Sequence, residues 1–186
     1  NLGRSNLRGW MIVITGGAGF IGSNLVAALS KKAGVPKITV VDRLGIDDKW
    51  KNLSNHLVHQ IIEPEQLDRY LSENDGSIEY VFHLGAISST TEKDVDLILR
   101  NNFNLSLKLW KWCTNHQIPF IYASSAATYG DGKNGFNDHF DPIELSKLKP
   151  LNPYGWSKHL FDKLVNYDVL NGSAYPPQWA GLKFFN

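Results

Sequence analysis

The chain has 186 residues, of which 42% are hydrophobic and 20% are charged, and its formal net charge at pH 7 is +1. These values suit one globular domain, and the small net charge excludes the basic field of a typical nucleic-acid or anionic-membrane binder. No apolar run reaches the about 18 residues of a membrane span, and the first residues lack the apolar core of a secretory signal. A single cysteine, Cys113, excludes an internal disulfide, so we expect a cytoplasmic protein.

The two ends of the chain differ from its middle. Residues 1–10 precede the only methionine, Met11, and we expect them to be a leader or an artificial remnant outside the fold. At the other end, AGLKFFN (180–186) has the pattern of a strand that stops without a turn or cap. We therefore expect the printed sequence to be a fragment of a longer chain.

Short apolar runs alternate with segments of helical periodicity. The runs are MIVIT (11–15), KITVV (37–41), YVFHL (80–84), PFIYAS (119–124) and GLKFF (181–185). Their near-continuous apolar character is typical of strands buried on both faces. Helices are predicted over the amphipathic pattern of Ile21, Leu25, Ala28 and Leu29, from the capping-box pair Ser89 and Glu92, and from Pro153. Residues 44–78 give no clear element, but the alternation predicts an α/β fold with a doubly wound parallel sheet.

A glycine-rich segment, TGGAGFIG (15–22), follows the first run and opens the first predicted helix. Glycines in such a turn adopt dihedrals barred to side chains and let a pyrophosphate approach the backbone and the helix N-terminus. The motif alone is weak, because glycine turns also end strands for purely structural reasons. Asp42 strengthens it, since an acid about 20 residues beyond the last glycine meets the adenosine ribose in Rossmann-type folds. The residues assigned to this dinucleotide site are Gly16, Gly19, Phe20, Ile21, Gly22 and Asp42.

Two cations near this acid bear on the choice of cofactor. Arg43 follows Asp42 directly and Lys49 lies six residues further on, and either could hold a 2′-phosphate. They could equally be solvated surface charges, and Asp42 by itself would suit NAD. The balance favours NADP, with NAD as the alternative.

A serine, a tyrosine and a lysine fall where catalytic groups are expected. The fourth run, PFIYAS, leads into YASSAATYG (122–130), which places Ser125 at the carboxyl rim of the sheet, where ligands bind. Tyr154 and Lys158 are four residues apart in NPYGWSKHL and share one helix face. An ammonium one turn away favours a phenolate, which lets the tyrosine act as a proton acceptor. An isolated pair of this kind would be better explained as packing, but the preceding motifs favour catalysis.

With these motifs in this order, the chain resembles the extended short-chain dehydrogenase/reductase family over residues 11–186. The resemblance implies that these residues form its NAD(P)-binding, Rossmann-type domain and that a C-terminal substrate-binding portion lies outside the printed sequence. The resemblance implies catalytic roles for Ser125, Tyr154 and Lys158, with Tyr154 and Lys158 also contacting the cofactor. It also places Asn101 where members have an asparagine that supports the cofactor site, although a polar residue on a helix face would explain it too. The stretch at the end of the third run is further assigned to the cofactor: Leu84, Gly85, Ala86, Ile87 and Ser88.

The residues of several segments narrow the choice among the reactions of this family. Dehydratases of the family carry an acidic pair beyond the serine, where this chain has Ala126, Ala127 and Thr128, so elimination is disfavoured. The segments HLGAISSTTE (83–92), ASSAATYG (123–130) and PLNPYGWSKHLFD (150–162) resemble the ADP-glycero-manno-heptose 6-epimerase subfamily of lipopolysaccharide core biosynthesis. That resemblance implies inversion at C6 through a transient ketone, with Ser88, Ser125 and Asn186 contacting the substrate and a second acid/base residue beyond residue 186.

The remaining expectations concern partners and alternatives. The resemblance implies a homo-oligomer, with a pentamer as its form, and a nucleotide-sugar substrate, with no nucleic acid or membrane partner. His56 and His59 form H-x-x-H without a cluster of further ligands, so no metal site is predicted. Another nucleotide-sugar epimerase or reductase, or a non-catalytic dinucleotide-binding module, stays open as an alternative.

Overall fold

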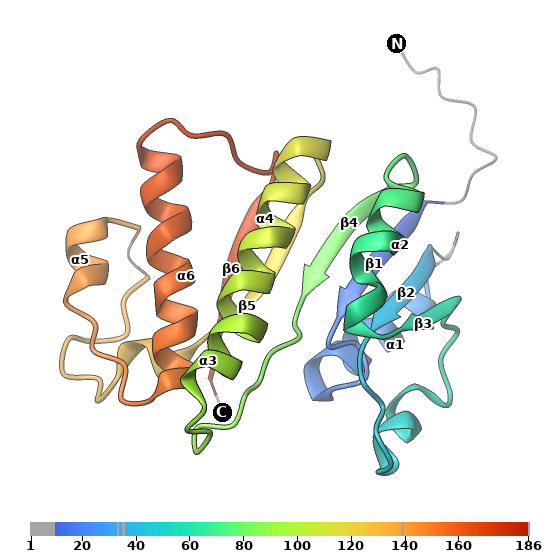
Figure 1. Ribbon diagram of the computed structural model, residues 1–186, viewed down its shortest axis with the longest axis horizontal. Helices are drawn as coiled ribbons and strands as arrows, with labels where there is room; N and C mark the ends of the chain where they lie inside the picture. Colours follow the sequence, from blue (N-terminus) through green and yellow to red (C-terminus); the bar gives the residue numbers. More distant parts are fainter. Residues whose placement is uncertain (1–9, 33, 35, 139, 186) are drawn as a thin grey trace. The chain divides into compact units, whose positions relative to one another are not determined.

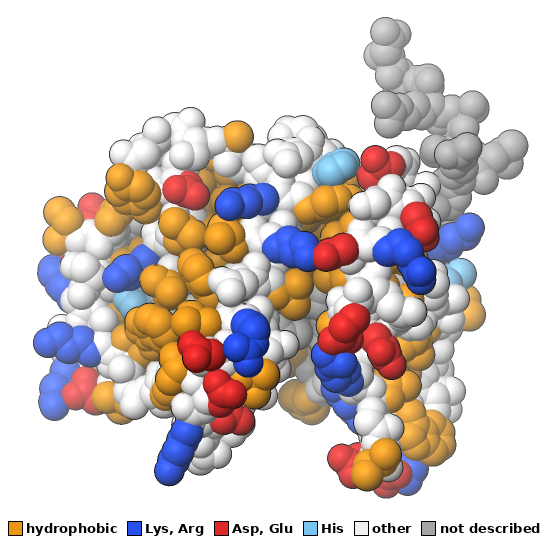
Figure 2. All heavy atoms as spheres, in the orientation of Figure 1, with side chains coloured by type: hydrophobic (Ala, Val, Ile, Leu, Met, Phe, Trp, Pro, Cys, Tyr) orange, Lys and Arg blue, Asp and Glu red, His pale blue; other side chains and the backbone are white. Residues whose placement is uncertain are grey.

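The computed structural model describes residues 10–32, 34, 36–138 and 140–185. It divides into two compact units, residues 1–85 and 86–186, and each is described here by itself. Among the described residues, no helix is both long and apolar enough to cross a membrane. On the face drawn in Figure 2, basic and acidic side chains are interspersed with hydrophobic ones.

The first unit is a parallel sheet with helices along its strands (Figure 1). Its strands are β1 (Met11–Thr15), β2 (Lys37–Val41), β3 (Gln60–Ile62) and β4 (Ile78–His83), in the order β3-β2-β1-β4. All the pairings among them are parallel, and β1 shifts register against β4 between Met11 and Ile12. The helical elements are α1 (Phe20–Ser30), η1 (Asp48–Leu53), η2 (Pro64–Gln66) and α2 (Leu67–Asn74).

Alternate residues of the central strands cover the two faces of this sheet. Ile12, Ile14, Ile38 and Val40 are buried in one cluster with Val26 of α1. Thr39 lies between Ile38 and Val40 in the strand, and its hydroxyl bonds the hydroxyl of Tyr70 in α2 at 2.7 Å. Because successive side chains point to opposite faces, α1 and α2 cover different faces of the sheet.

The second unit is built on two parallel strands, β5 (Phe120–Ser125) and β6 (Trp179–Phe184), which pair from Phe120 with Trp179 to Ser125 with Phe184. Its helices are α3 (Val95–Ile98), the π-helical turn η3 (Leu99–Asn104), α4 (Leu105–His116), the 3₁₀ turn η4 (Ala126–Tyr129), α5 (Pro142–Ser146) and α6 (Pro153–Leu170).

Aromatic side chains form the centre of the second unit. Trp110 of α4 contacts Phe120 of β5, Phe161 of α6 and Trp179 of β6 edge to face, with ring centroids 5.2–6.2 Å apart. Cys113, one turn further along α4, is fully buried, and burial raises the pKa of its thiol. Both helices that carry these rings therefore pack on the two strands.

The structure confirms most of the predicted elements and corrects two. All five apolar runs form strands, within two residues of the predicted bounds, and α6 begins at Pro153. The helix predicted from Ser89 is wrong at its start: α3 begins at Val95, where the Asp94 carboxylate caps the Leu97 N–H at 2.9 Å. Residues 44–78, which gave no clear element, contain β3 and α2.

Candidate functional site

The glycine turn after β1 has a shape that only glycine permits. Gly16 has φ +68°, and its N–H donates to the carbonyl of Val41 at the end of β2 (2.9 Å). A Cβ on Gly16 would lie 2.6 Å from the backbone nitrogen of Gly85, and one on Gly22 would overlap the carbonyl oxygen of Gly16. The turn leads directly into the N-terminus of α1 at Phe20. It therefore has the tightness and the helix end that a bound phosphate requires.

Replacing Gly22 by alanine is expected to lower the affinity for NAD and NADP by about tenfold to a hundredfold, since displaced backbone of this kind costs about 1–3 kcal/mol. Isothermal titration of the purified protein with each dinucleotide measures the effect. Gly76→Ala is the matched control, because a Cβ there meets nothing within 4 Å. Equal affinities for the two variants would contradict the assignment of this turn to the cofactor.

The predicted acid, Asp42, is hydrogen-bonded to the backbone of the glycine turn. One carboxylate oxygen of Asp42 accepts from the N–H of Ala18 (2.9 Å), and the other accepts from the N–H of Arg43 (2.8 Å) and from Lys49 Nζ (2.5 Å). Arg43 itself pairs with Glu65 on the surface, and this hydrogen bond raises the pKa of Arg43 and lowers that of Glu65. Both cations considered for a 2′-phosphate are thus paired with carboxylates in this structure.

A buried pair holds the end of β4 close to the glycine turn. Thr15 Oγ1 lies 2.6 Å from His83 Nδ1 and accepts from the N–H of Gly85 at 3.1 Å. His83 is fully buried and bonded, as expected of a histidine that serves the core. Leu84 and Gly85, both predicted to contact the cofactor, therefore have a fixed backbone beside the glycine turn.

In the second unit, Ser125 ends β5 and caps the turn η4. Its hydroxyl oxygen accepts from the N–H of Ala127 at 3.1 Å. Helix α6 approaches this turn at Gly155, where a Cβ would lie 2.7 Å from the carbonyl oxygen of Ala127. Asn152 caps α6 by accepting from the N–H of Gly155 at 2.7 Å. The backbone two residues after Ser125 thus lies close to the backbone next to Tyr154, and the two predicted catalytic groups come from adjoining segments.

Lys158 lies one turn after Tyr154 and is buried, with 3% of its surface exposed. Loss of solvent lowers the pKa of its ammonium from 10.5 to about 8, and the carboxylate of Asp162 partly opposes this shift. At neutral pH the ammonium is still protonated. It can therefore donate hydrogen bonds and favour a negative charge on a neighbouring oxygen.

A buried asparagine that the sequence did not single out, Asn102, organises this region, and the cofactor role of Asn101 stays a prediction. The side chain of Asn101 donates to the carbonyl of Leu97 within its own helix (2.8 Å). The fully buried Asn102 instead binds both backbone groups of Ile87, at 2.8 and 3.0 Å, and donates to the hydroxyl of Ser157 (3.1 Å). Asn102 thereby ties the predicted cofactor loop to the helix that carries Tyr154 and Lys158. Adjacent asparagines in RNNFN could not be distinguished from the sequence, because the π-helical turn shifts which one points inward.

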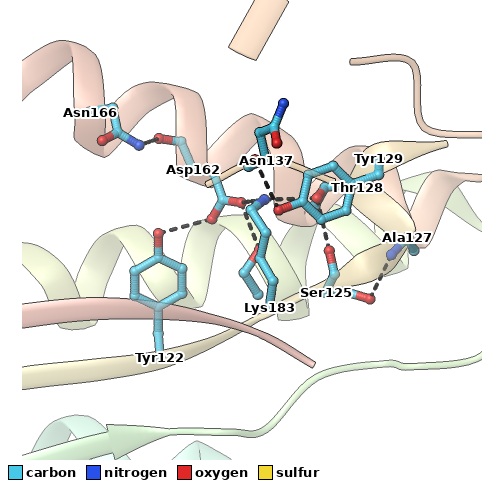
Figure 3. Close-up of polar contacts among 10 residues, drawn as sticks. Tyr122, Ser125, Ala127, Thr128, Tyr129, Asn137, Asp162, Asn166 and Lys183 are labelled. Atoms are coloured by element: carbon cyan, nitrogen blue, oxygen red, sulfur yellow. Dashed lines mark hydrogen bonds and ion pairs between the residues drawn. The ribbon is translucent and has the colours of Figure 1, made fainter. Parts of the chain in front are cut away.

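Two other residues were missed, Asp162 and Lys183, which form a buried ion pair of 2.8 Å (Figure 3). Asp162 is four residues after Lys158, so helical spacing places it on the face that bears the catalytic pair, and this signal could have found it. Asn186, predicted to contact the substrate, lies outside the described residues. Among the residues that are described, no cluster of three histidine, cysteine or carboxylate side chains could hold a metal ion.

Comparison with known proteins agrees with this geometry. A family model described as the NAD dependent epimerase/dehydratase family matches residues 12–172. The chain is 46% identical to an ADP-L-glycero-D-manno-heptose-6-epimerase of Fusobacterium nucleatum over 178 residues, which cover 95% of this chain and 52% of that protein. It thus spans about half the length of the curated relatives it matches.

Solved structures give the same picture. The crystal structure of the Helicobacter pylori ADP-L-glycero-D-manno-heptose-6-epimerase matches with a TM-score of 0.76 at 29% identity, over 97% of this chain and 56% of that one. A UDP-glucuronic acid 4-epimerase from Bacillus cereus in complex with NAD matches with a TM-score of 0.67 at 26% identity, over 87% and 52% of the two chains. The predicted fold, a doubly wound parallel α/β domain of the Rossmann type, is confirmed.

Proposed function

Because the chain belongs to the NAD dependent epimerase/dehydratase family, we propose that the protein inverts C6 of ADP-glycero-manno-heptose through a transient ketone. The observation that carries the proposal is the joining of Ser125 and Tyr154 through the backbone contact of Ala127 with Gly155, with a buried Lys158 one turn on. Relatives named for this activity, at 42–46% identity, support the choice of substrate.

The residues of the chain fit a nicotinamide dinucleotide. The glycine turn excludes side chains where a pyrophosphate needs backbone contact, and Asp42 offers a carboxylate beside that turn. When bound, the dinucleotide supplies the acceptor and the donor of the hydride. Exposed Phe20 and the backbone of Leu84 and Gly85 would line the same cofactor.

The proton chemistry falls to the chain's own side chains. Tyr154 takes the proton of the C6 hydroxyl as the ketone forms, and after the sugar presents its other face the second acid/base residue, from beyond residue 186, gives a proton to the reduced oxygen. Lys158, protonated below pH 8, stabilises the phenolate and donates to a ribose hydroxyl. The Ser125 hydroxyl donates to the reacting oxygen and holds it near Tyr154. Ser88 and Asn186 are proposed as further substrate contacts.

The choice of NADP over NAD is part of the proposal. Lys49 lies beside Asp42, and Arg43 is exposed, so both are within reach of the ribose that this acid would bind. A bound 2′-phosphate would take the place of Glu65 as the partner of Arg43, and it carries more negative charge than that carboxylate. Asp42, Arg43 and Lys49 would then bind the phosphorylated ribose together.

The compartment, the pathway and the oligomeric state that we propose rest on the resemblance to the subfamily. The enzyme would act in the cytoplasm, in lipopolysaccharide core biosynthesis, as a homo-oligomer of pentameric form. A second acid/base residue on the opposite face of the sugar would come from beyond residue 186.

The proposal predicts that the full-length protein converts one C6 epimer of ADP-glycero-manno-heptose into an equilibrium mixture without added oxidant or reductant. Proton NMR of the sugar follows the inversion, and chromatography of the acid-released nucleotide identifies the bound cofactor, for which we expect NADP. Inversion of a UDP-hexose but not of the heptose would replace the substrate, and the absence of any turnover with bound dinucleotide would favour a non-catalytic module.

A further inference from the structure

A buried carboxylate on α6 collects hydrogen bonds from both strands of the second unit (Figure 3). The Tyr122 hydroxyl donates to Asp162 Oδ1 at 2.9 Å, while Ser124 Oγ and Lys183 Nζ donate to Oδ2 at 2.6 and 2.8 Å. The side chains of Asp162 and Lys183 are only 5% and 14% exposed. The ion pair is therefore largely shielded from solvent, on the same helix as Tyr154.

The sequence of the strands brings these groups together. Tyr122 and Ser124 are two residues apart on β5 and so share one face of the strand. Lys183 pairs with Ser124 in register on β6 and points to the same side. Gly181 lies beneath the Tyr122 ring, where a side chain would overlap it. The side chains of Tyr122, Ser124 and Lys183 thus converge on Asp162.

The network continues from Lys183 to the backbone of Ser125. Lys183 Nζ donates to Thr128 Oγ1 at 2.7 Å, and Thr128 Oγ1 donates to the carbonyl of Ser125 at 2.8 Å. An ammonium can only donate, so the Thr128 hydroxyl must accept from Lys183 and keep its own hydrogen for that carbonyl. Lys183 also lies 5.0 Å from the centre of the Tyr129 ring, which limits its movement. The orientation of the hydroxyl is thereby fixed.

We propose that Lys183, Asp162 and Thr128 are positioning residues that set where the Ser125 hydroxyl lies relative to Tyr154. The proposal rests on the catalytic roles of Ser125 and Tyr154 proposed above. The ion pair joins Asp162 of α6 to Lys183 of β6, Thr128 belongs to η4, and Ser125 ends β5 before that turn, so the network ties together the segments that bear Ser125 and Tyr154. A buried ion pair adds little net stability compared with apolar packing, which favours a geometric role for it.

Matched substitutions at Thr128 distinguish the effect of its hydroxyl on the position of Ser125 from the effect of its buried side chain on packing. Thr128→Val keeps the shape of the fully buried side chain but removes the hydroxyl, whereas Thr128→Ser keeps the hydroxyl. We expect Thr128→Val to lower kcat about tenfold to a hundredfold with KM changed by less than about threefold, because small displacements near a reacting centre cost this much. Thr128→Ser should stay near the wild-type kcat.

A second pair of variants tests the cation itself. Lys183→Met is expected to reduce kcat at least as much as Thr128→Val, and Lys183→Arg, which keeps the charge and the donors, should restore much of the loss. Lys163→Met, at an exposed position next to Asp162 on α6, is the control and should leave kcat unchanged. An unaltered kcat in Thr128→Val, or equal losses in the valine and serine variants, would overturn the proposal.

Hydrogen exchange decides the same point without turnover. The N–H of Ala127 is held by Ser125 Oγ, so a displaced Ser125 should expose it. We expect this amide to exchange about tenfold or more faster in Thr128→Val than in Thr128→Ser. Identical exchange would refute the positioning role even if the protein proved inactive on every sugar. Inactivity of the wild type together with the expected exchange would instead count against the proposed function alone.

Discussion

Tyr154→Phe is expected to lower kcat for the proposed epimerisation by about a hundredfold to ten-thousandfold, which is the usual contribution of a general acid or base. The substitution removes one oxygen from a half-buried ring on α6 and leaves the caps of that helix, Asn152 and Asn171, in place. The fold and the dinucleotide site should therefore be retained. Proton NMR of the heptose nucleotide, with initial rates compared at equal protein concentration, measures the loss.

The matched control for this prediction is Tyr167→Phe, which removes the same atom from an exposed ring near the end of the same helix. Its rate should equal that of the wild type. The dinucleotide released from Tyr154→Phe on denaturation should match the wild type in kind and amount. An undiminished rate in Tyr154→Phe would remove the proton-transfer role from Tyr154 and revive the non-catalytic alternative.

Lys158→Met is expected to abolish turnover and yet to raise the free energy of unfolding by about 3 kcal/mol at neutral pH. Burial lowers the pKa of Lys158 from 10.5 to about 8, and a shift of this size corresponds to about 1.4 kcal/mol for every tenfold change in proton affinity. The free energy of unfolding of the wild type is lower by this amount because folding removes the charged ammonium from water. A methionine fills similar space without a charge.

The dependence of stability on pH tests the physical cause of this predicted gain. Between pH 8 and pH 10.5 the unfolded chain binds more protons at this position than the folded chain, so the stability of the wild type rises with pH. The advantage of Lys158→Met should then shrink towards zero at pH 10.5. Urea unfolding at neutral pH and again near pH 10.5 tests this. Lys163→Met, on the exposed side of α6, should show no such dependence.

Local patterns in the sequence were sufficient for the strands, the glycine turn and the start of α6. Each depends on neighbouring residues: continuous apolar runs for the strands, Gly16 and Gly22 for a turn that admits no Cβ, and Asn152 with Pro153 for a helix start. The resemblance to known families supplied what local patterns could not, namely the role of Ser125 and the choice of reaction.

Features that depend on three-dimensional register could not be predicted. Asn102, the buried amide that binds Ile87, lies in a π-helical turn, and no local pattern in the sequence marks that turn. Lys183 meets Asp162 because β6 pairs with β5 in one particular register, which a sequence with two apolar strands leaves open. The start of α3 was misplaced for a related reason, since Asp94 competed successfully with Ser89 as the cap.

The single cysteine of the chain gives the second unit a built-in chemical reporter. Cys113 lies on α4 one turn from Trp110 of the aromatic centre and is fully buried, and burial raises the pKa of its thiol, so alkylating reagents have neither access nor a nucleophile in the folded state. Labelling can then proceed only as fast as that centre opens to solvent. The rate of maleimide incorporation therefore counts opening events directly, and it does so in the native chain without an engineered label.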